Sequence, residues 1–320
     1  MSEINQNQES NQNLNSVLRS GFKLNEAEIL ACEEALTENE EDLSSRLKLL
    51  GFYWFNKHWD ACVPHLIWLI EKSPESEVLS WEAATVGDQV SDPELFKDLK
   101  NRWELAIKAP THPRVLLNAA AFFLASQPER SVDLLEQAHE MDAADDEILE
   151  KLASTYQLAL KEDEKSPLLA KALTIQKELM ERMPDSKKQL IELARLYLYK
   201  GETREAKHLV DGALTSLTGS KDLPLLAEAH CVRGLIYLEE GLLNKAKDEL
   251  SALPSIPKFD LANKLIARGE LKAVSQYLKK NLKHWKAGKI QLALWIAQLE
   301  LGMKPELHST WLLSYTPEKR

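Results

Sequence analysis

The sequence predicts an all-α fold, an array of antiparallel helix pairs, on three observations. Only 11 of 320 residues are glycine, well below the usual ~7%, and helix-forming residues dominate. The hydrophobic content of 44% is sufficient for a continuous core. Two stretches also repeat one spacing within a period of roughly 20–50 residues, which is typical of a helical solenoid. The repeated residues are Ala194, Tyr197, Gly201 and Ala206, then Gly234, Tyr237, Gly241 and Ala246.

This spacing describes two helices joined by a tight turn. Small residues such as Ala194 and Ala206 suit the crossing of two helices, whose axes are only ~8–10 Å apart. Gly201 and Gly241 suit the left-handed conformation that ends a helix, which costs a residue with a Cβ roughly 1–2 kcal/mol. We interpret these residues as architecture rather than chemistry.

The sequence predicts a tail and irregular helices in the first part of the chain. Residues 1–16 are dominated by Asn, Gln, Ser and Glu and are predicted to be a disordered polar tail. Residues 17–108 are predicted to form an N-terminal helical cap with degenerate first repeats. Apolar periodicity predicts one helix from Asn25 and another over about 42–56, with a partner that begins near His58.

Proline and aspartate residues mark the next predicted helix boundaries. Pro74 ends the partner helix, because proline cannot continue a helix. Residues 78–91 predict a loop or a short helix. Asp92 and Pro93 then predict a helix start, with an aspartate cap and proline in the first turn.

Residues 109–288 predict regular helix pairs. The predicted pairs are 115–125 with 129–141, 148–160 with 167–183, 189–200 with 203–217, 225–240 with 243–253, and 259–267 with 271–285. Residues 289–320 predict a capping helix over 290–301 and a short tail around Trp311. The chain should therefore be more than ~65% helical, with essentially no strand.

The chain resembles the tetratricopeptide repeat family over about residues 42–302, most specifically over 193–250. Beyond the two stretches above, Gly269 with Leu271 is a weaker instance, and 49–76 is a distorted one with a shortened turn. That last segment is also similar to uncharacterised bacterial helical-repeat proteins, which implies no activity. The family resemblance implies a right-handed superhelix of antiparallel helix pairs that binds a protein or peptide.

In this family the first helix of each pair forms the concave wall. The resemblance implies the partner-binding residues Phe123, Arg195, Leu198, Tyr199, Leu235, Leu238 and Glu239, on a wall that also includes Leu116, Ala120, Leu124, Gln157, Leu158 and Ile191. The Lys and Asn pattern that clamps a C-terminal carboxylate in chaperone-binding relatives is absent. An apolar wall with an isolated arginine suits an amphipathic helix or an extended apolar peptide. The chain's own tail or a second copy filling the groove remains an alternative.

No sequence motif indicates catalysis. A zinc-protease helix, a nucleophile elbow, a phosphate loop and a Cys-x-x-Cys pair are all missing, so we expect a non-enzymatic protein without cofactor or metal. His58 and His65 are interpreted as polar parts of an aromatic cluster rather than metal ligands. That cluster is predicted to be a hydrophobic end-cap, with a ligand cage as the alternative, and contains Tyr53, Trp54, Phe55, Trp59 and Trp68. An enzyme built on helical hairpins is a further alternative.

Charge and composition favour a cytoplasmic protein-binding module. The formal charge of −10 disfavours general nucleic-acid binding. The three cysteines, Cys32, Cys62 and Cys231, suggest reduced buried thiols, and the chain shows neither a secretory signal nor a membrane span. Residues 256–292 carry nine Lys or Arg against two acids. The alternative function is therefore a regulatory or targeting domain that contacts nucleic acid or an anionic surface through this segment.

Overall fold

A computed structural model describes residues 14–80, 92–160, 167–256, 258–285 and 288–308. These residues are 76% helical and contain no strand, which confirms the predicted all-α class. The predictions for residues 1–13, for most of 78–91 and for the tail around Trp311 lie outside the described residues. Residues 14–16, assigned to the tail by composition, are helical.

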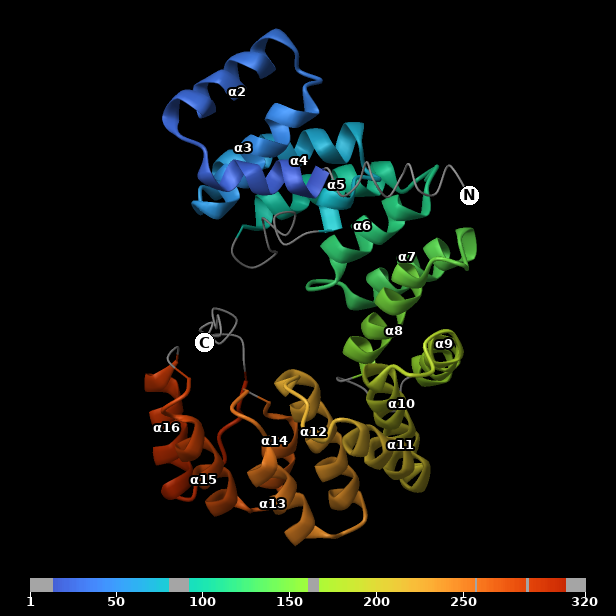
Figure 1. The fold of residues 1–320 in the computed structure, drawn as a ribbon, viewed down its shortest axis with the longest axis vertical. Coiled ribbons are helices and arrows are strands. Elements are labelled where there is room, and N and C mark those ends of the chain that lie inside the picture. Colours follow the sequence, from blue (N-terminus) through green and yellow to red (C-terminus); the bar gives the residue numbers. More distant parts are fainter. Residues whose placement is uncertain (1–13, 81–91, 161–166, 257, 286–287, 309–320) are drawn as a thin grey trace. The chain divides into compact units, whose positions relative to one another are not determined.

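The chain divides by its packing into two compact units, Met1–Ala159 and Leu160–Arg320. In each unit, helices that follow one another in sequence pack side by side (Figure 1). The domain boundaries predicted at residues 16, 108 and 288 stay predictions.

Unit 1 contains a helical segment over 14–20 followed by short and long helices. Its elements are η1 Gly21–Lys23, α2 Glu26–Glu38, α3 Leu43–Phe55, α4 Trp59–Lys72, η2 Glu77–Ser80, α5 Pro93–Ala106, α6 Pro113–Phe123, α7 Pro128–Met141 and α8 Asp146–Leu160. Sequence signals account for several boundaries: Asn25 forms a capping box with Glu28, and Asp92 caps α5 before Pro93.

Two glycines let the helical segment over 14–20 and η1 lie directly on α3. A Cβ at Gly51 would lie 2.0 Å from the carbonyl oxygen of Leu18, and one at Gly21 would lie 2.0 Å from that of Lys48. Leu18 is fully buried by this contact. Gly51 is therefore a close-approach glycine inside a helix.

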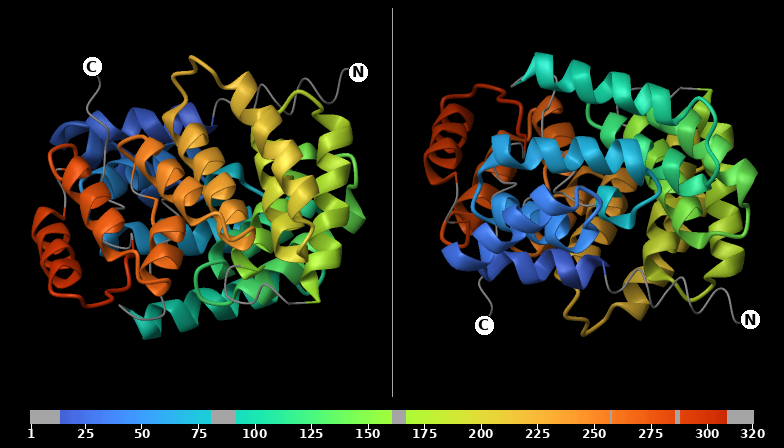
Figure 2. Two further views of the ribbon diagram at one scale, coloured as in Figure 1. Left: turned by 90° about the horizontal axis from the view of Figure 1, so that it is seen from below. Right: turned by 90° about the horizontal axis from the view of Figure 1, so that it is seen from above.

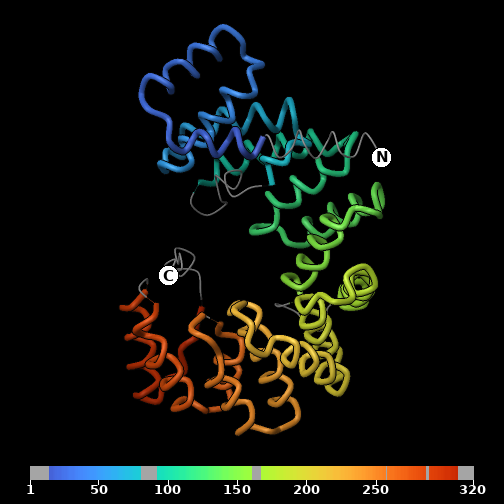
Figure 3. Tube along the Cα trace, in the orientation of Figure 1, coloured from blue at the N-terminus to red at the C-terminus, as the bar shows by residue number. Residues whose placement is uncertain are grey.

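Unit 2 contains the regular pairs. Its helices are α9 Leu168–Arg182, α10 Lys187–Lys200, α11 Thr203–Ser216, α12 Leu223–Glu239, α13 Leu243–Ala252, α14 Asp260–Ala267, α15 Leu271–Asn281 and α16 Lys289–Glu300. The order is easily followed along the tube in Figure 3. The helix α12 contacts both α10 and α14, and α13 contacts α15. The helices of unit 2 are drawn from yellow to red in Figure 2.

The predicted crossings and turns are present in unit 2. Ala194, Ala206 and Ala246 are fully buried. A Cβ at Gly234 would lie 2.3 Å from Leu261 Cδ2, so a larger residue at that crossing would displace the Leu261 side chain. The turn glycine Gly201 has a φ of 84°; its N–H donates to the Leu198 carbonyl at 2.9 Å, and the next N–H donates to the Tyr197 carbonyl at 2.9 Å.

The same turn joins α3 and α4, with lysine in the place of glycine. Lys57 has a φ of 61°, its N–H donates to the Trp54 carbonyl at 3.1 Å, and the His58 N–H donates to the Tyr53 carbonyl at 2.8 Å. The prediction of a shortened turn in 49–76 is therefore wrong. The turn has the usual length, and the sequence pattern missed it because Lys57 is not glycine.

Candidate functional site

The candidate site is the face of unit 2 formed by α10, α12 and α14, where most of the predicted groove residues lie. Four predicted partner-binding side chains are instead buried, with exposed fractions of 0% for Phe123, 3% for Arg195, 8% for Leu235 and 5% for Leu238. Of the wider predicted wall, Leu116, Ala120, Gln157 and Ile191 are also buried, whereas Leu124 is half-buried and Leu158 is exposed.

These side chains are buried rather than exposed because the first helices of neighbouring pairs pack directly against each other. Leu235 and Leu238 belong to one hydrophobic cluster with residues of α14, and Leu198 packs against it. Phe123 lies in unit 1, where its ring packs edge-on against that of Phe122, the preceding residue of α6, with ring centres 5.1 Å apart. Leu198 and Tyr199 are half-buried and Glu239 is exposed, so these three remain available to a partner.

Arg195 belongs to a buried ion cluster. Its guanidinium contacts Glu228 of α12, and a second guanidinium nitrogen lies 3.8 Å from Asp260 Oδ2 of α14. The Lys258 ammonium contacts Glu228 and lies 3.5 Å from Asp260 Oδ2. Two cations and two carboxylates thus connect α10, α12 and α14. The expectation that Arg195 presents a lone charge to a partner is wrong.

The cluster is electrostatically self-sufficient. Burial would raise the pKa of Glu228, but the charges of Arg195 and Lys258 outweigh it and lower that pKa to about 2. Burial raises the pKa of the neighbouring Cys231 thiol to about 11, which leaves it protonated and unreactive at neutral pH. Removing one partner of a buried pair typically costs about 3–5 kcal/mol, so the cluster is a structural connection between the three helices.

An extended segment of the chain itself lies on α14. The Asn263 side-chain amide donates to the Leu307 carbonyl at 2.8 Å, and the Leu307 N–H donates to Asn263 Oδ1 at 2.9 Å. Leu307 is only 2% exposed and joins the hydrophobic cluster of α12, α14 and α16. Lys304 Nζ donates to the Ala267 carbonyl at 3.3 Å, at the end of α14. Part of this face is thus filled by the chain's own C-terminal segment.

Sequence reasoning missed Asn263 and Leu307, although one signal was available. Gly302 ends α16 with a φ of 80°, in the same turn as Gly201. Leu307 follows Gly302 by five residues, as Ala206 follows Gly201. The repeated spacing therefore continues past α16 and places a buried side chain at 307.

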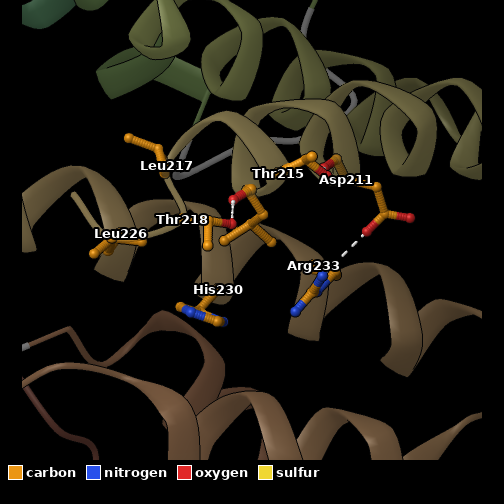
Figure 4. Close-up of a pocket in the computed structure, with 9 residues that line it drawn as sticks. Asp211, Thr215, Leu217, Thr218, Leu226, His230 and Arg233 are labelled. Carbon is orange, nitrogen blue, oxygen red and sulfur yellow. Dashed lines mark hydrogen bonds and ion pairs between the residues drawn. The ribbon is translucent and has the colours of Figure 1, made fainter.

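A separate pocket of about 480 Å³ lies between α11 and α12, and its lining residues are Asp211, Leu214, Thr215, Leu217, Thr218, Gly219, Leu226, His230 and Arg233 (Figure 4). Arg233 donates to Asp211 at 3.2 Å and to both oxygens of Glu249, in α13, at 3.0 and 3.2 Å. His230 Nδ1 lies 2.8 Å from Glu249. The charges of Arg233, Asp211 and Glu249 satisfy one another, so the network braces α11, α12 and α13.

The aromatic cluster of unit 1 separates into two groups. Trp54 and Phe55 pack on Phe22, with ring centres 6.0 and 5.0 Å apart. Tyr53 stacks on His65 at 5.9 Å. Phe55 is 54% exposed, so this surface is only partly covered.

The other group of unit 1 is buried around Trp68 and His65. The Arg46 guanidinium lies 4.4 Å from the centre of the buried Trp68 ring. Burial, with a smaller contribution from Arg46, lowers the pKa of His65 to about 4. No group of three or more His, Cys, Asp or Glu among the described residues could hold a metal ion.

Acids from elsewhere in unit 2 balance part of the basic segment 256–292. Besides the Lys258 contact with Glu228, Arg268 lies 3.4 Å from Glu239, and Lys279 contacts Glu300. All three acids lie outside the segment. The net positive charge around this segment is therefore lower than its sequence alone indicates.

The predicted capping helix, α16, has an apolar outer side. Ile290 is 80% exposed, Leu294 52% and Leu301 79%. Terminal helices of repeat arrays normally present a polar outer face.

Models of known protein families and the sequences of curated proteins were both compared with the chain, and neither gives a match. Within the ranges that the structure describes, no helix is both long enough and apolar enough to cross a membrane.

Proposed function

We propose that this chain is a non-enzymatic, cytoplasmic helical-repeat scaffold of the tetratricopeptide type, which binds an extended segment of a partner protein on the face of α10, α12 and α14. The repeated hairpin spacing, the left-handed turns and the sequential helix packing support the repeat assignment. In this proposal the pairs form a right-handed superhelix, and no cofactor takes part.

One observation carries the proposal: Asn263 pairs with both main-chain groups of Leu307. Peptide-recognition sites commonly combine main-chain hydrogen bonds, which any sequence can make, with a side-chain pocket that selects one residue. The surface of α14 combines both features, because the Leu307 side chain is buried beside these hydrogen bonds.

The rest of the face supplies contacts for the flanks of a bound segment. Leu198 and Tyr199 on α10 are half-buried and Glu239 on α12 is exposed. Aromatic side chains are enriched among the residues that dominate binding energy. An apolar or amphipathic segment suits this face. Self-association through the exposed apolar side chains of α16 is compatible with the same proposal.

Capture from native lysate, with mass spectrometry of the retained proteins, tests the proposal. Tyr199→Ala should weaken capture tenfold or more, about 1.4 kcal/mol, and leave the melting temperature unchanged. The control, His208→Ala, changes an exposed ring on α11, in the same helix pair. Equal capture by Tyr199→Ala and wild type would place the binding surface elsewhere.

The alternative, contact with nucleic acid or an anionic surface through 256–292, has no comparable support. Lys258, Arg268 and Lys279 have acidic partners within unit 2. Phosphate binding needs clustered, free positive charge.

A further inference from the structure

We infer that residues 304–308 are an internal ligand of the α14 face, and that a partner binds there by displacing them. The partner segment would be extended, with a leucine anchor, a lysine three residues before it and an imidazole or aromatic ring directly after it. This inference rests on the proposed function, because it names the partner chemistry and the regulation of the same site.

The hydrogen-bond geometry shows why a segment from another protein can replace this one. Asn263 offers one donor and one acceptor to the carbonyl and the N–H of a single residue, at 2.8 and 2.9 Å. Every residue except proline carries that pair of main-chain groups. The two hydrogen bonds therefore recognise an extended main chain and impose no side-chain requirement.

Burial shows where selectivity lies. Leu307 is 2% exposed, whereas its neighbours Glu306 and His308 are exposed. One apolar side chain thus enters the cluster that contains Phe259 and Trp295. A site with one deep position selects for one residue, and its size and shape here fit leucine.

Two flanking contacts define the rest of the motif. Lys304 Nζ donates to the Ala267 carbonyl at 3.3 Å, and a cation is favourable at the C-terminal end of a helix. The His308 ring lies 5.5 Å from the Trp295 ring, edge-on. A competing segment would reproduce these contacts with Lys at position −3 and an imidazole or aromatic ring at position +1 relative to leucine.

The connection through Gly302 explains how the internal segment regulates access. A ligand tethered by a few residues has an effective concentration in the millimolar range, so it competes strongly with a free segment. A weak partner would be excluded, and a partner with additional contacts to Leu198 or Tyr199 would displace the internal segment.

Fluorescence anisotropy with a labelled peptide of residues 302–308 tests this inference on the full-length chain. Leu307→Asp should release the internal segment, because an unpaired carboxylate is costly to bury. We expect this variant to bind the peptide at least tenfold more tightly than wild type does. Adding Asn263→Ala to Leu307→Asp should weaken that binding at least tenfold.

Two controls keep the test specific. Leu301→Asp places the same charge on a residue that is 79% exposed, and it should bind the peptide as wild type does. A peptide with Asp in place of leucine should not bind the Leu307→Asp variant. Circular dichroism melting shows whether each variant is folded.

If Leu307→Asp fails to fold, hydrogen exchange on wild type replaces it: excess peptide should accelerate exchange of the Leu307 amide, and the Asp peptide should not. Unchanged binding in the folded variant, or unchanged exchange in wild type, would overturn the inference. Capture that depends on Tyr199 but is equal for wild type and Leu307→Asp would overturn the inference alone and leave the scaffold function standing.

Discussion

Each unit contains an asparagine that holds non-helical main chain, but the two are built differently: the 73–76 segment in unit 1 is a turn, closed by a hydrogen bond from the Ser76 N–H to the Ser73 carbonyl at 2.9 Å. In unit 1, Asn118 of α6 is fully buried and its amide donates to the carbonyls of Pro74 at 2.8 Å and Ser76 at 2.9 Å. In unit 2, Asn263 is half-buried and pairs with the N–H and carbonyl of Leu307. Asn118 fixes a connection inside the unit, whereas Asn263 holds a segment with exposed neighbours.

This comparison extends to backbone contacts. Unit 1 brings main chain against main chain at Gly51, with no room for a Cβ. In unit 2, Gly212 lies inside α11 with no atom within 4 Å of a Cβ position. The two glycines therefore differ in role: a close backbone contact requires Gly51, whereas Gly212 lies in open space and is not required by any contact.

The largest expected effect is at these glycines. Gly51→Ala should destabilise the protein by about 3 kcal/mol, because the added Cβ overlaps the Leu18 carbonyl, a backbone atom that cannot simply rotate away. Gly212→Ala should stabilise it by about 1 kcal/mol, since alanine is the better helix former. Urea denaturation of both variants measures the difference. A tolerated Gly51→Ala would show that the 14–20 segment does not lie on α3.

The next-largest expected effect on stability distinguishes Asn118 from Asn263. Asn118→Ala leaves the Pro74 carbonyl without its partner, whereas the Ser76 carbonyl keeps the hydrogen bond from the Leu79 N–H at 3.0 Å. The change should cost about 2 kcal/mol, given a penalty of about 1–3 kcal/mol for a buried unsatisfied group. Asn263→Ala should cost only about 1 kcal/mol, because Leu307 lies between the exposed residues Glu306 and His308 and the segment can shift until water reaches the released groups. Denaturation compares the two, and hydrogen exchange at Leu307 should increase in Asn263→Ala only. Equal costs would show that the Leu307 segment is as permanent as the 74–76 connection.

Much of the fold follows from the sequence, and the reason is local. The turns inside the pairs α10–α11 and α12–α13 lie at Gly201 and Gly241, because glycine adopts the left-handed conformation at no cost. Pro93 and Pro113 similarly mark helix starts. Such signals lie within a few residues of the structure they determine.

Long-range contacts were not predictable in the same way. Gly51 lies inside the helix predicted over about 42–56, yet its role depends on Leu18, in a segment that composition assigned partly to the tail. Arg195 was placed on a groove wall, and Glu228 and Asp260 bury it. Asn263 and Leu307 are 44 residues apart, and no local pattern pairs them.

Lowering the pH should destabilise unit 1 and unit 2 in different pH ranges. His65 in unit 1 has a pKa lowered from 6.5 to about 4, so its neutral form is favoured by folding and stability is lost as pH falls below 6.5 towards 4. The loss should reach about 2 kcal/mol at pH 5. Glu228 in unit 2 has a pKa lowered from 4.5 to about 2, so its contribution is lost only as pH falls through that lower range.

Hydrogen exchange at pH 7, 5 and 3.5 resolves the two ranges, because it reports each unit separately. The protection factors of amides in α3 and α4, which correct for the intrinsic pH dependence of exchange, should fall between pH 7 and 5, before those of α12 respond. His65→Gln should remove the loss between pH 7 and 5. Simultaneous opening of both units at one pH would contradict these assignments.

The smallest expected effect concerns a type of turn that occurs in both units. Lys57 and Gly201 have φ angles of 61° and 84°, and the same pair of hydrogen bonds closes both turns. Because a Cβ in this conformation costs roughly 1–2 kcal/mol, Lys57→Gly should stabilise unit 1 by about 1 kcal/mol and Gly201→Ala should destabilise unit 2 by a similar amount. A Cβ at Gly201 meets no atom within 4 Å, so the effect there is purely conformational. Urea denaturation of the two single variants should give opposite signs. A destabilising Lys57→Gly would mean that the lysine side chain, and not only its backbone, contributes to the α3–α4 turn.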